Sequence, residues 1–439
     1  EVGFSTGGFE ARYGDKMSSV LNVTYKTPTE FSGTAEIGIL TANLHVEGAS
    51  KSKKDDSRNG RFTYLVGARR FATTYLLQSL ETQGDYRPEF YDFQSLLTWS
   101  PGKKYREPIY RERKNGSIDT IYQPDEKLKI SLLTAVARNE YLFQPQNRET
   151  TFGTVQRAFR LFVAFEGQER TNYLTGQSAL LVEHRPRFNL NLKYILTAFQ
   201  SRESELFDIE GGYRLADVKT SLGSDEFNEI IFVRGIGTYL NHARNYLIAS
   251  VFAAEHRGEW FSKGNRNKLL WGLRVQREVI DDELKEWAGT DSADYFKIDE
   301  VYSSRNYLES TRISGYIQDS WKLVSNGILR LNAGSRFNYW TLNQQLLVSP
   351  RFQFIFDPSQ KDSSKQYQIR IAAGLYQQPP FYREMRFFDG SVNTKLKAQS
   401  SWHFILGGDY VFRIWGRPYK TFLEAYYKSM DNLVPYEVD

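Results

Sequence analysis

A two-residue alternation of apolar and polar side chains constrains this chain more than any other feature of its sequence. In residues 329–339 the odd positions are apolar apart from Ser335, and the even positions carry Arg330, Asn332, Gly334, Arg336 and Asn338. Residues 189–198 and 366–375 repeat the pattern. Successive side chains of a strand point to opposite faces, and helical spacing is not sustained in these stretches. The alternation predicts strands with one apolar face and one polar, basic face.

About fifteen segments of this kind follow one another along the chain. They lie near 32–41, 42–50, 61–72, 91–99, 127–139, 171–185, 188–207, 239–258, 268–282, 309–323, 328–343, 347–357, 366–377, 400–414 and 419–430. Some gaps read as tight turns, at 185–187, 325–327 and 415–418, whereas 208–238, 283–308 and 378–399 read as long polar loops. Short turns at one end and long loops at the other predict an antiparallel up-and-down β-meander of the outer-membrane type.

The length of these segments favours a membrane barrel over a soluble sandwich. A tilted strand that crosses a bilayer needs about 9–11 residues, whereas strands of soluble proteins usually run about 5–6. Several segments exceed ten residues, and aromatic side chains such as Tyr339, Trp340, Trp402 and Trp415 cluster near their ends. Amphipathic rings prefer the headgroup level of a bilayer. A soluble all-β protein remains the alternative at this point.

Composition removes several other classes of protein. The 439 residues contain 28 Tyr, 30 Phe and 8 Trp, which is too much apolar ring surface for a disordered chain. No apolar run approaches the roughly 18 residues of a membrane helix. The absence of Cys excludes disulfides and thiolate sites. The net charge of +5 is spread along the chain, so we expect no nucleic-acid partner.

Several ordered motifs resemble TonB-dependent outer-membrane transporters. The string Gly-Gly-Phe-Glu-Ala-Arg-Tyr-Gly-Asp at 7–15, followed by 17–24, resembles the end of that family's plug domain. Gln-Asp-Ser-Trp at 318–321 resembles a recurring strand end. The run from Ser349-Pro350-Arg351-Phe352 through the Pro-Pro loop at 379–380 to Leu396-Lys397-Ala398-Gln399 is similar to a later part of the family pattern.

The resemblance implies a transmembrane antiparallel up-and-down β-barrel of the 22-stranded type, incomplete in this chain. Residues 1–27 would be the end of a lumenal plug domain, lying against the inner wall. Residues 28–439 would be the N-terminal two-thirds of the barrel. An incomplete barrel should leave two unpaired edges, near 32–41 and 419–430.

The function implied by the resemblance is active import of a nutrient across the outer membrane of a Gram-negative bacterium. The nutrient could be an iron chelate, cobalamin, a glycan or a peptide. The implied partners are outer-membrane lipid, the small substrate, a surface lipoprotein and an inner-membrane TonB-type energising protein, whose contact segment is absent from this chain. We expect no cofactor. The alternatives are a passive porin or a structural or adhesive barrel, and a soluble β-rich carbohydrate-binding protein.

No spacing in the sequence indicates catalysis or a metal site, so we do not expect an enzyme. Weak candidates for substrate binding are Phe381, Tyr382 and Arg383 in a loop, and the lumen-facing residues Arg330, Arg336, Arg370 and His403. The acidic run 281–283 reads as a solvated loop cluster. The residues expected on the outer, lipid-facing side are Leu190, Leu192, Leu331, Ala333, Ile369 and Ile371.

Overall fold

The computed structural model describes residues 2–5, 7–50, 61–78, 84–101, 104–112, 118–262, 264, 266–292, 295–324, 327–360 and 366–435, with backbone alone at 61, 104–112, 118–126 and 360. The elements are β1 (Val2–Ser5), β2 (Val20–Val23), β3 (Ser32–Ile37), β4 (Thr41–Ala49), β5 (Arg61–Ala72), α1 (Thr74–Gln78), β6 (Gly84–Ser100), β7 (Lys104–Glu112), β8 (Ile118–Glu126), β9 (Leu128–Pro145), β10 (Arg148–Gly153), β11 (Ala158–Arg187), β12 (Leu190–Val218), β13 (Ile230–Phe261), β14 (Asn267–Ser292), β15 (Tyr295–Lys322), β16 (Leu329–Trp340), β17 (Gln345–Phe356), η2 (Pro358–Gln360), β18 (Tyr367–Gln378), α2 (Tyr382–Met385), β19 (Gln399–Ile414) and β20 (Arg417–Asp431).

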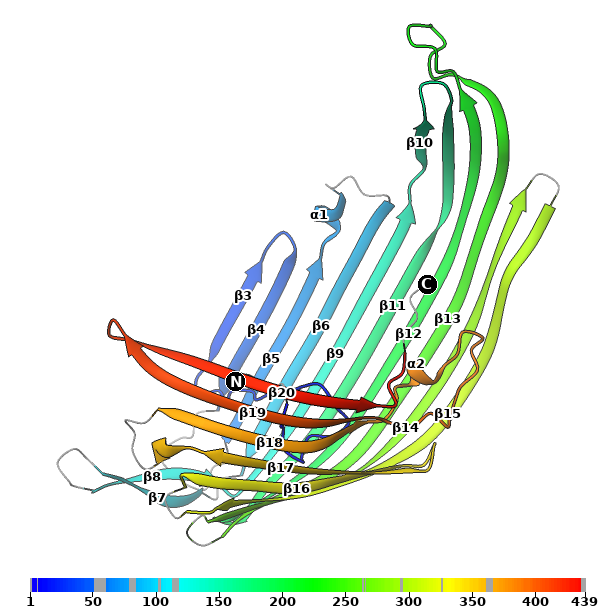
Figure 1. Ribbon diagram of the computed structural model, residues 1–439. Helices are drawn as coiled ribbons and strands as arrows, with labels where there is room; N and C mark the ends of the chain where they lie inside the picture. The colour runs from blue at the N-terminus through cyan, green and yellow to red at the C-terminus, as the bar shows by residue number, and fades with distance from the viewer. Residues whose placement is uncertain are drawn as a thin grey trace.

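One antiparallel sheet of 16 strands dominates the molecule. Its order runs from β3 to β20 in chain order, with β7 and β8 paired only with each other and β10 attached to β11. Each of the fifteen predicted segments overlaps one strand of this sheet. The predicted all-β, antiparallel up-and-down architecture is therefore confirmed. The sheet bends into an open trough, in which β3 to β15 form a tall wall and β16 to β20 curve round to face it (Figure 1).

The sheet has two edges, at β3 and β20. Within the described residues these two strands do not pair with each other, and the predicted edge positions are confirmed. The β19–β20 hairpin is closed by Trp415 and Gly416, whose φ angles are 51° and 73°. Positive φ at both central residues gives a turn whose twist matches that of its strands. The turn predicted at 415–418 is confirmed.

The two faces of the sheet differ as the alternation predicted. We call the face that touches residues 7–16 the inner face and its opposite the outer face. On β18, Ile369 and Ile371 are 42% and 52% exposed, whereas Ala372 is buried beneath the N-terminal residues. Strand alternation gives Arg370 the inner face with Ala372. The same alternation gives the outer face to Leu190, Leu192, Leu331 and Ala333, and the inner face to Arg330 and Arg336.

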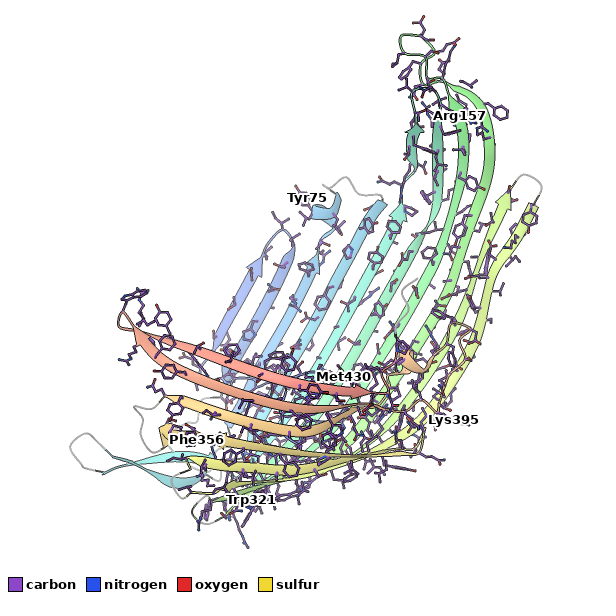
Figure 2. The ribbon with its side chains drawn as sticks, in the orientation of Figure 1. Tyr75, Arg157, Trp321, Phe356, Lys395 and Met430 are labelled. Carbon is purple, nitrogen blue, oxygen red and sulfur yellow. The ribbon has the colours of Figure 1, made fainter. Side chains whose placement is uncertain are left out.

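Two predicted long loops are wrong. Residues 208–218 and 230–238 continue β12 and β13, and only 219–229 connect them. Likewise 283–292 and 295–308 extend β14 and β15. In these extensions apolar and polar residues no longer alternate regularly, while the backbone ladder continues. The strands therefore continue beyond the point where the sequence pattern that predicts them ends. Figure 2 shows the resulting height of the sheet, with Trp321 at one end and Arg157 at the tip of the other end.

The predicted asymmetry of the connections holds only in part. The end with short turns also carries the β7–β8 hairpin, and the end with long loops contains the tight turn 341–344. The turn predicted at 185–187 lies at Phe188 and Asn189 instead. The turn predicted at 325–327 lies partly outside the described residues. Neither α-helix in the described part of the chain is long and apolar enough to cross a membrane.

Candidate functional site

Residues 7–16, which we call the inner segment, lie against the inner face of the trough. They follow β1 and precede β2, which pair with each other as a small separate hairpin. Gly8 has a φ of 61°, and a Cβ on it would lie 3.0 Å from the Cβ of Ala372 on β18. A glycine is required here for both reasons, because a side chain would be strained and crowded. The chain can thus approach the wall at van der Waals distance.

Arg351 on β17 is the main anchor of the inner segment. Its Nη1 donates to the carbonyl oxygens of Phe9, Glu10 and Tyr13, at 3.4, 2.7 and 2.6 Å. Its guanidinium also lies over the ring of Tyr376, 4.3 Å from the centroid. Arg351 is only 5% exposed, so its charge is balanced by carbonyl dipoles and ring faces rather than by water. Loss of these carbonyl partners would leave the buried charge of Arg351 without hydrogen bonds, which is energetically unfavourable. Arg351 therefore holds the inner segment firmly.

Contacts on either side of Arg351 extend the attachment from β14 to β19. The backbone N–H of Ala11 donates to Gln318 Oε1 at 2.8 Å, and Ala11 packs with Leu270 and Tyr316. Asn338 Nδ2 donates to Asp15 Oδ1 at 2.6 Å. The prediction that the N-terminal residues lie against the inner wall is confirmed for the inner segment. The whole described part of 1–27 stays outside the large sheet.

The loop between β18 and β19, residues 379–398, folds inward across the trough to the opposite wall (Figure 1). Tyr382 in α2 donates its hydroxyl to Asp282 Oδ2 on β14 at 2.6 Å, and Arg386 Nη1 lies 3.3 Å from the same carboxylate. Asp282 is 2% exposed. The loop therefore shields this carboxylate from water and supplies its hydrogen bonds. We call the contact between Tyr382 and Asp282 the clamp. We call residues 379–398 the folded-in loop.

Further bonds hold the folded-in loop to two more wall strands, β12 and β15. Arg383 Nη2 pairs with Glu203 on β12 at 2.9 Å, and Asn306 Nδ2 on β15 donates to the carbonyl oxygen of Gly390 at 2.7 Å. Burial and the hydrogen bond to Asp282 raise the pKa of Tyr382 well above its usual range. The Lys16 ammonium lies 5.4 Å from the ring centroid of Phe381. This contact joins the folded-in loop to the inner segment in one continuous inner structure.

The structure divides the predicted site residues into three groups. Phe381, Tyr382 and Arg383 belong to the folded-in loop. Arg336, which lies 3.6 Å from Asp15, and His403 lie under the inner segment. His403 is 1% exposed and stacks on Tyr376 with 4.3 Å between ring centroids.

Arg330 and Arg370 form the third group and stay on the wall. Arg330 pairs with Asp357 at 3.2 Å, and Arg370 pairs with Glu424 at 2.8 Å. Arg330 thus joins β16 to the end of β17, whereas Arg370 on β18 reaches across Gly407 of β19 to Glu424 on β20. The structure does not bring these two residues to the inner segment.

Sequence reasoning missed the residues that organise this inner structure. Alternation could have placed Arg351 on the polar face with Ser349, but not against Glu10, 341 positions away. The acidic run 281–283 was wrongly interpreted as a solvated loop, because Asp282 is buried on a strand. The sequence around a carboxylate does not reveal that a loop 100 positions later folds back onto it.

The inner face also borders a cavity in which Lys193 and Arg257 of the lining are paired with acids of the wall. A cavity of about 510 Å³ separates residues 23–28 from the wall strands β5 to β13, and its polar lining includes Lys193, Glu183 and Arg257. Lys193 Nζ lies 3.2 Å from Glu183, and Arg257 Nε lies 2.6 Å from Glu255. Among the described residues, no group of three or more His, Asp or Glu side chains could hold a metal ion.

Comparison with known proteins gives remote structural likenesses alone. No family model and no curated protein sequence matches the chain. The outer membrane transporter YddB from Escherichia coli has a TM-score of 0.44 and 10% identity, covering 94% of this chain and 54% of YddB. The toluene transporter TodX from Pseudomonas putida has a TM-score of 0.22 and 12% identity, covering 90% of this chain and 82% of TodX. The copper transporter OprC has a TM-score of 0.20 and 8% identity, covering 98% of this chain and 85% of OprC.

The chain thus spans about half the length of YddB. With all three TM-scores below 0.5, these likenesses do not decide the function of this chain.

Proposed function

We propose that this chain forms the wall of an active outer-membrane transporter in a Gram-negative bacterium. The observation that carries the proposal is the inner segment, held by Arg351, Gln318 and Asn338 against the inner face of a wall whose outer face is apolar. Some outer-membrane barrels carry a peptide segment in the lumen that blocks the path at rest. A transporter that opens a closed path needs such an internal obstruction.

The outer face supports a membrane position. On β5 it runs from Phe62 to its border at Arg70, a stretch of nine residues. A tilted strand needs about 9–11 residues to cross a bilayer. Leu196 and Ile371 on this face are 56% and 52% exposed. A soluble protein rarely leaves so extended an apolar face uncovered, whereas lipid covers it at no cost.

In the proposed mechanism, a small nutrient binds near the folded-in loop, and an inner-membrane TonB-type protein pulls the inner segment from the wall. Most contacts to be broken are hydrogen bonds to neutral carbonyls, each worth about 1.5–3 kcal/mol when the donor is charged. Bonds of this size hold the segment at rest and can reform after each cycle. No catalytic step is required, and the reaction is transfer of the nutrient across the membrane.

A reversible crosslink between the inner segment and the wall tests this proposal. The chain has no Cys, so Gly8→Cys with Ala372→Cys would introduce a single disulfide. A Cβ on Gly8 would lie 3.0 Å from the Ala372 Cβ, close to the 3.5–4.5 Å usual for disulfides. We expect oxidised cells to lose protonophore-sensitive uptake of iron chelates, cobalamin, glycans or peptides, and dithiothreitol to restore it. The single variant Ala372→Cys is the matched control. The single variant Gly8→Cys measures separately the strain that a side chain adds at a φ of 61° without a crosslink, and only the loss that dithiothreitol reverses in the double variant counts for the proposal.

The alternative functions give different results in the same experiment. A passive porin would show uptake that neither the protonophore nor the disulfide changes. A structural or adhesive barrel would show no uptake of any tested nutrient in either redox state. Either result would contradict active transport, and neither would affect the position of the inner segment.

A further inference from the structure

The upper border of the outer apolar face carries a row of four arginines, which we call the outer arginine row. They are Arg70 on β5, Arg138 on β9, Arg170 on β11 and Arg202 on β12. The register sets Arg70 opposite Tyr91 and Tyr91 opposite Arg138, so these three side chains share one face. Two residues below them, Phe93 and Val136 are 42% and 44% exposed on the same face. The arginines therefore begin where the apolar belt stops.

The charge of this row is only partly balanced. Glu140 accepts from Arg138 at 2.8 Å and from Arg170 at 2.6 Å. Glu89 lies 3.4 Å from Arg70. Arg202 donates to the neutral amide of Gln200 at 3.1 Å. Four arginines and two glutamates leave 4 − 2 = 2 positive charges, and each guanidinium has five N–H donors of which these contacts use one or two.

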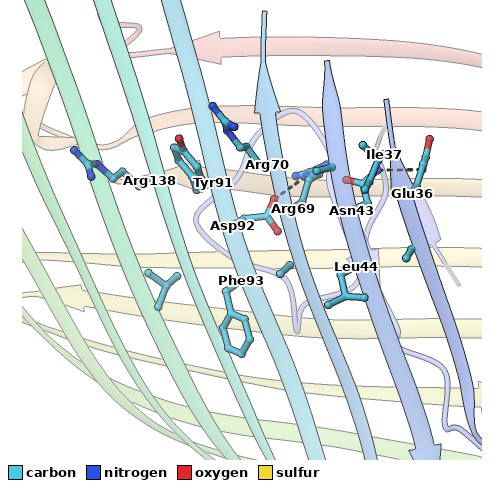
Figure 3. Close-up of a pocket in the computed structure, with 14 residues that line it drawn as sticks. Glu36, Ile37, Asn43, Leu44, Arg69, Arg70, Tyr91, Asp92, Phe93 and Arg138 are labelled. Atoms are coloured by element: carbon cyan, nitrogen blue, oxygen red, sulfur yellow. Dashed lines mark hydrogen bonds and ion pairs between the residues drawn. The ribbon is translucent and has the colours of Figure 1, made fainter. Parts of the chain in front are cut away.

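An apolar groove opens directly below Arg70 and Arg138. It has a volume of about 610 Å³. Its apolar lining comes from the five strands β3, β4, β5, β6 and β9 and consists of Ala35, Ile37, Ala42, Leu44, Ala68, Phe93 and Val136. Figure 3 shows Arg70, Tyr91 and Arg138 side by side along one end of the groove, with Leu44 and Phe93 below them. The site thus combines an apolar slot with a cationic rim on one side only.

We propose that this groove binds a phosphate-bearing anionic lipid of the surrounding membrane. An acyl chain lies along Leu44 and Phe93, and the phosphate lies between Arg70 and Arg138 with the ring of Tyr91 at its side. Arginine forks match phosphate oxygens geometrically, and their attraction is strong at the boundary of a low-dielectric medium. The inference depends on the outer face meeting lipid and not on transport, so it can hold where active transport fails.

Native mass spectrometry of the detergent-purified full chain tests the proposal, with phosphatidylglycerol as the probe and phosphatidylcholine as the uncharged-lipid reference. We expect Arg70→Gln with Arg138→Gln to retain at least fivefold less phosphatidylglycerol than the unmodified protein. Arg69→Gln is the matched control, because Arg69 is the neighbouring residue on the opposite face and pairs there with Asp92 at 2.6 Å. It should bind phosphatidylglycerol as the unmodified protein does.

A second variant keeps the test decisive if the double variant folds poorly. Leu44→Trp fills the groove at an exposed position, and it should reduce retention of phosphatidylglycerol while leaving both arginines in place. Inorganic phosphate at millimolar concentration should not displace the lipid, since the groove contributes the acyl contact. Equal retention of the two lipids, or full retention by both variants, overturns the proposal. Displacement by free phosphate would do the same, because it assigns the site to the anion alone.

Discussion

Arg351 Nη1 lies 2.6 Å from the carbonyl oxygen of Tyr13, although 338 positions separate the two residues in the chain. The same nitrogen also faces the carbonyl of Glu10 at 2.7 Å. One wall side chain therefore closes a turn of the inner segment and fixes it in place. The buried position of Arg351 means that neither partner can exchange the other for water without loss.

Removing this guanidinium should release the inner segment. In Arg351→Gln the charge-assisted hydrogen bonds are lost, at about 1.5–3 kcal/mol each. We expect trypsin to cut after Arg12 and Lys16 at least tenfold faster than in the unmodified protein. N-terminal peptides detected by mass spectrometry give the rate. Arg330→Gln is the control, since Arg330 pairs with Asp357 on the wall. Equal rates for the two variants would show that Arg351 does not hold the segment.

A charge on the outer face should destabilise the membrane-inserted protein. Ile371 is 52% exposed at the middle of β18 on this face. Ile371→Arg should lower the free energy of unfolding in phospholipid vesicles by about 2–4 kcal/mol. Ile371→Leu, which keeps the side chain apolar, should change it by less than about 1.5 kcal/mol. Urea unfolding followed by tryptophan fluorescence measures both. Unchanged stability of the arginine variant would argue that this face does not contact lipid.

The clamp between Tyr382 and Asp282 should weaken at high pH. The folded state raises the pKa of Tyr382 through burial and the Asp282 hydrogen bond, so it favours the neutral phenol. Its contribution to stability is fully present below the ordinary tyrosine pKa of about 10 and declines as pH rises above that value. The protection factors of amides in 379–398, which correct for the rise of intrinsic exchange with pH, should therefore fall above pH 10 in the unmodified protein.

Tyr382→Phe isolates this effect, because it keeps the ring and removes only the hydroxyl. The variant should show faster exchange of the folded-in loop already at neutral pH and lose the extra step above pH 10. Arg386 still pairs with Asp282 at 3.3 Å, so the loop should stay folded in. A step of unchanged size in the variant would assign the pH dependence to another group.

The β19–β20 turn should be sensitive to a single methyl group. Gly416 has a φ of 73°, where an L-residue costs about 1–2 kcal/mol. Gly416→Ala should therefore speed hydrogen exchange in residues 410–421 about fivefold to thirtyfold. Gly176→Ala on β11 is the control, because a Cβ there meets nothing within 4 Å and its φ is not positive. Matching exchange in both variants would contradict a left-handed turn at this site.

The sequence alone determined the local structure of the wall. Alternation is a property of each strand by itself, so it located all fifteen segments and assigned Ile371 and Arg370 to opposite faces. The Trp415–Gly416 turn was also readable, because it depends on two adjacent residues. The alternation missed the strand extensions 283–292 and 295–308 above the apolar belt, and it also missed β7 and β8 at the other end of the sheet.

Only the tertiary structure decided what lies inside the trough. Arg351, Gln318 and Asn338 are ordinary polar residues of a strand until residues 9–15 reach them from more than 300 positions away. Asp282 became a buried clamp because the folded-in loop crosses to it from β18. The physical reason is that a polar side chain shows its need for a partner in the sequence but not the partner itself. Sheet curvature decides which residues become partners, because it brings distant strands and loops to one inner surface.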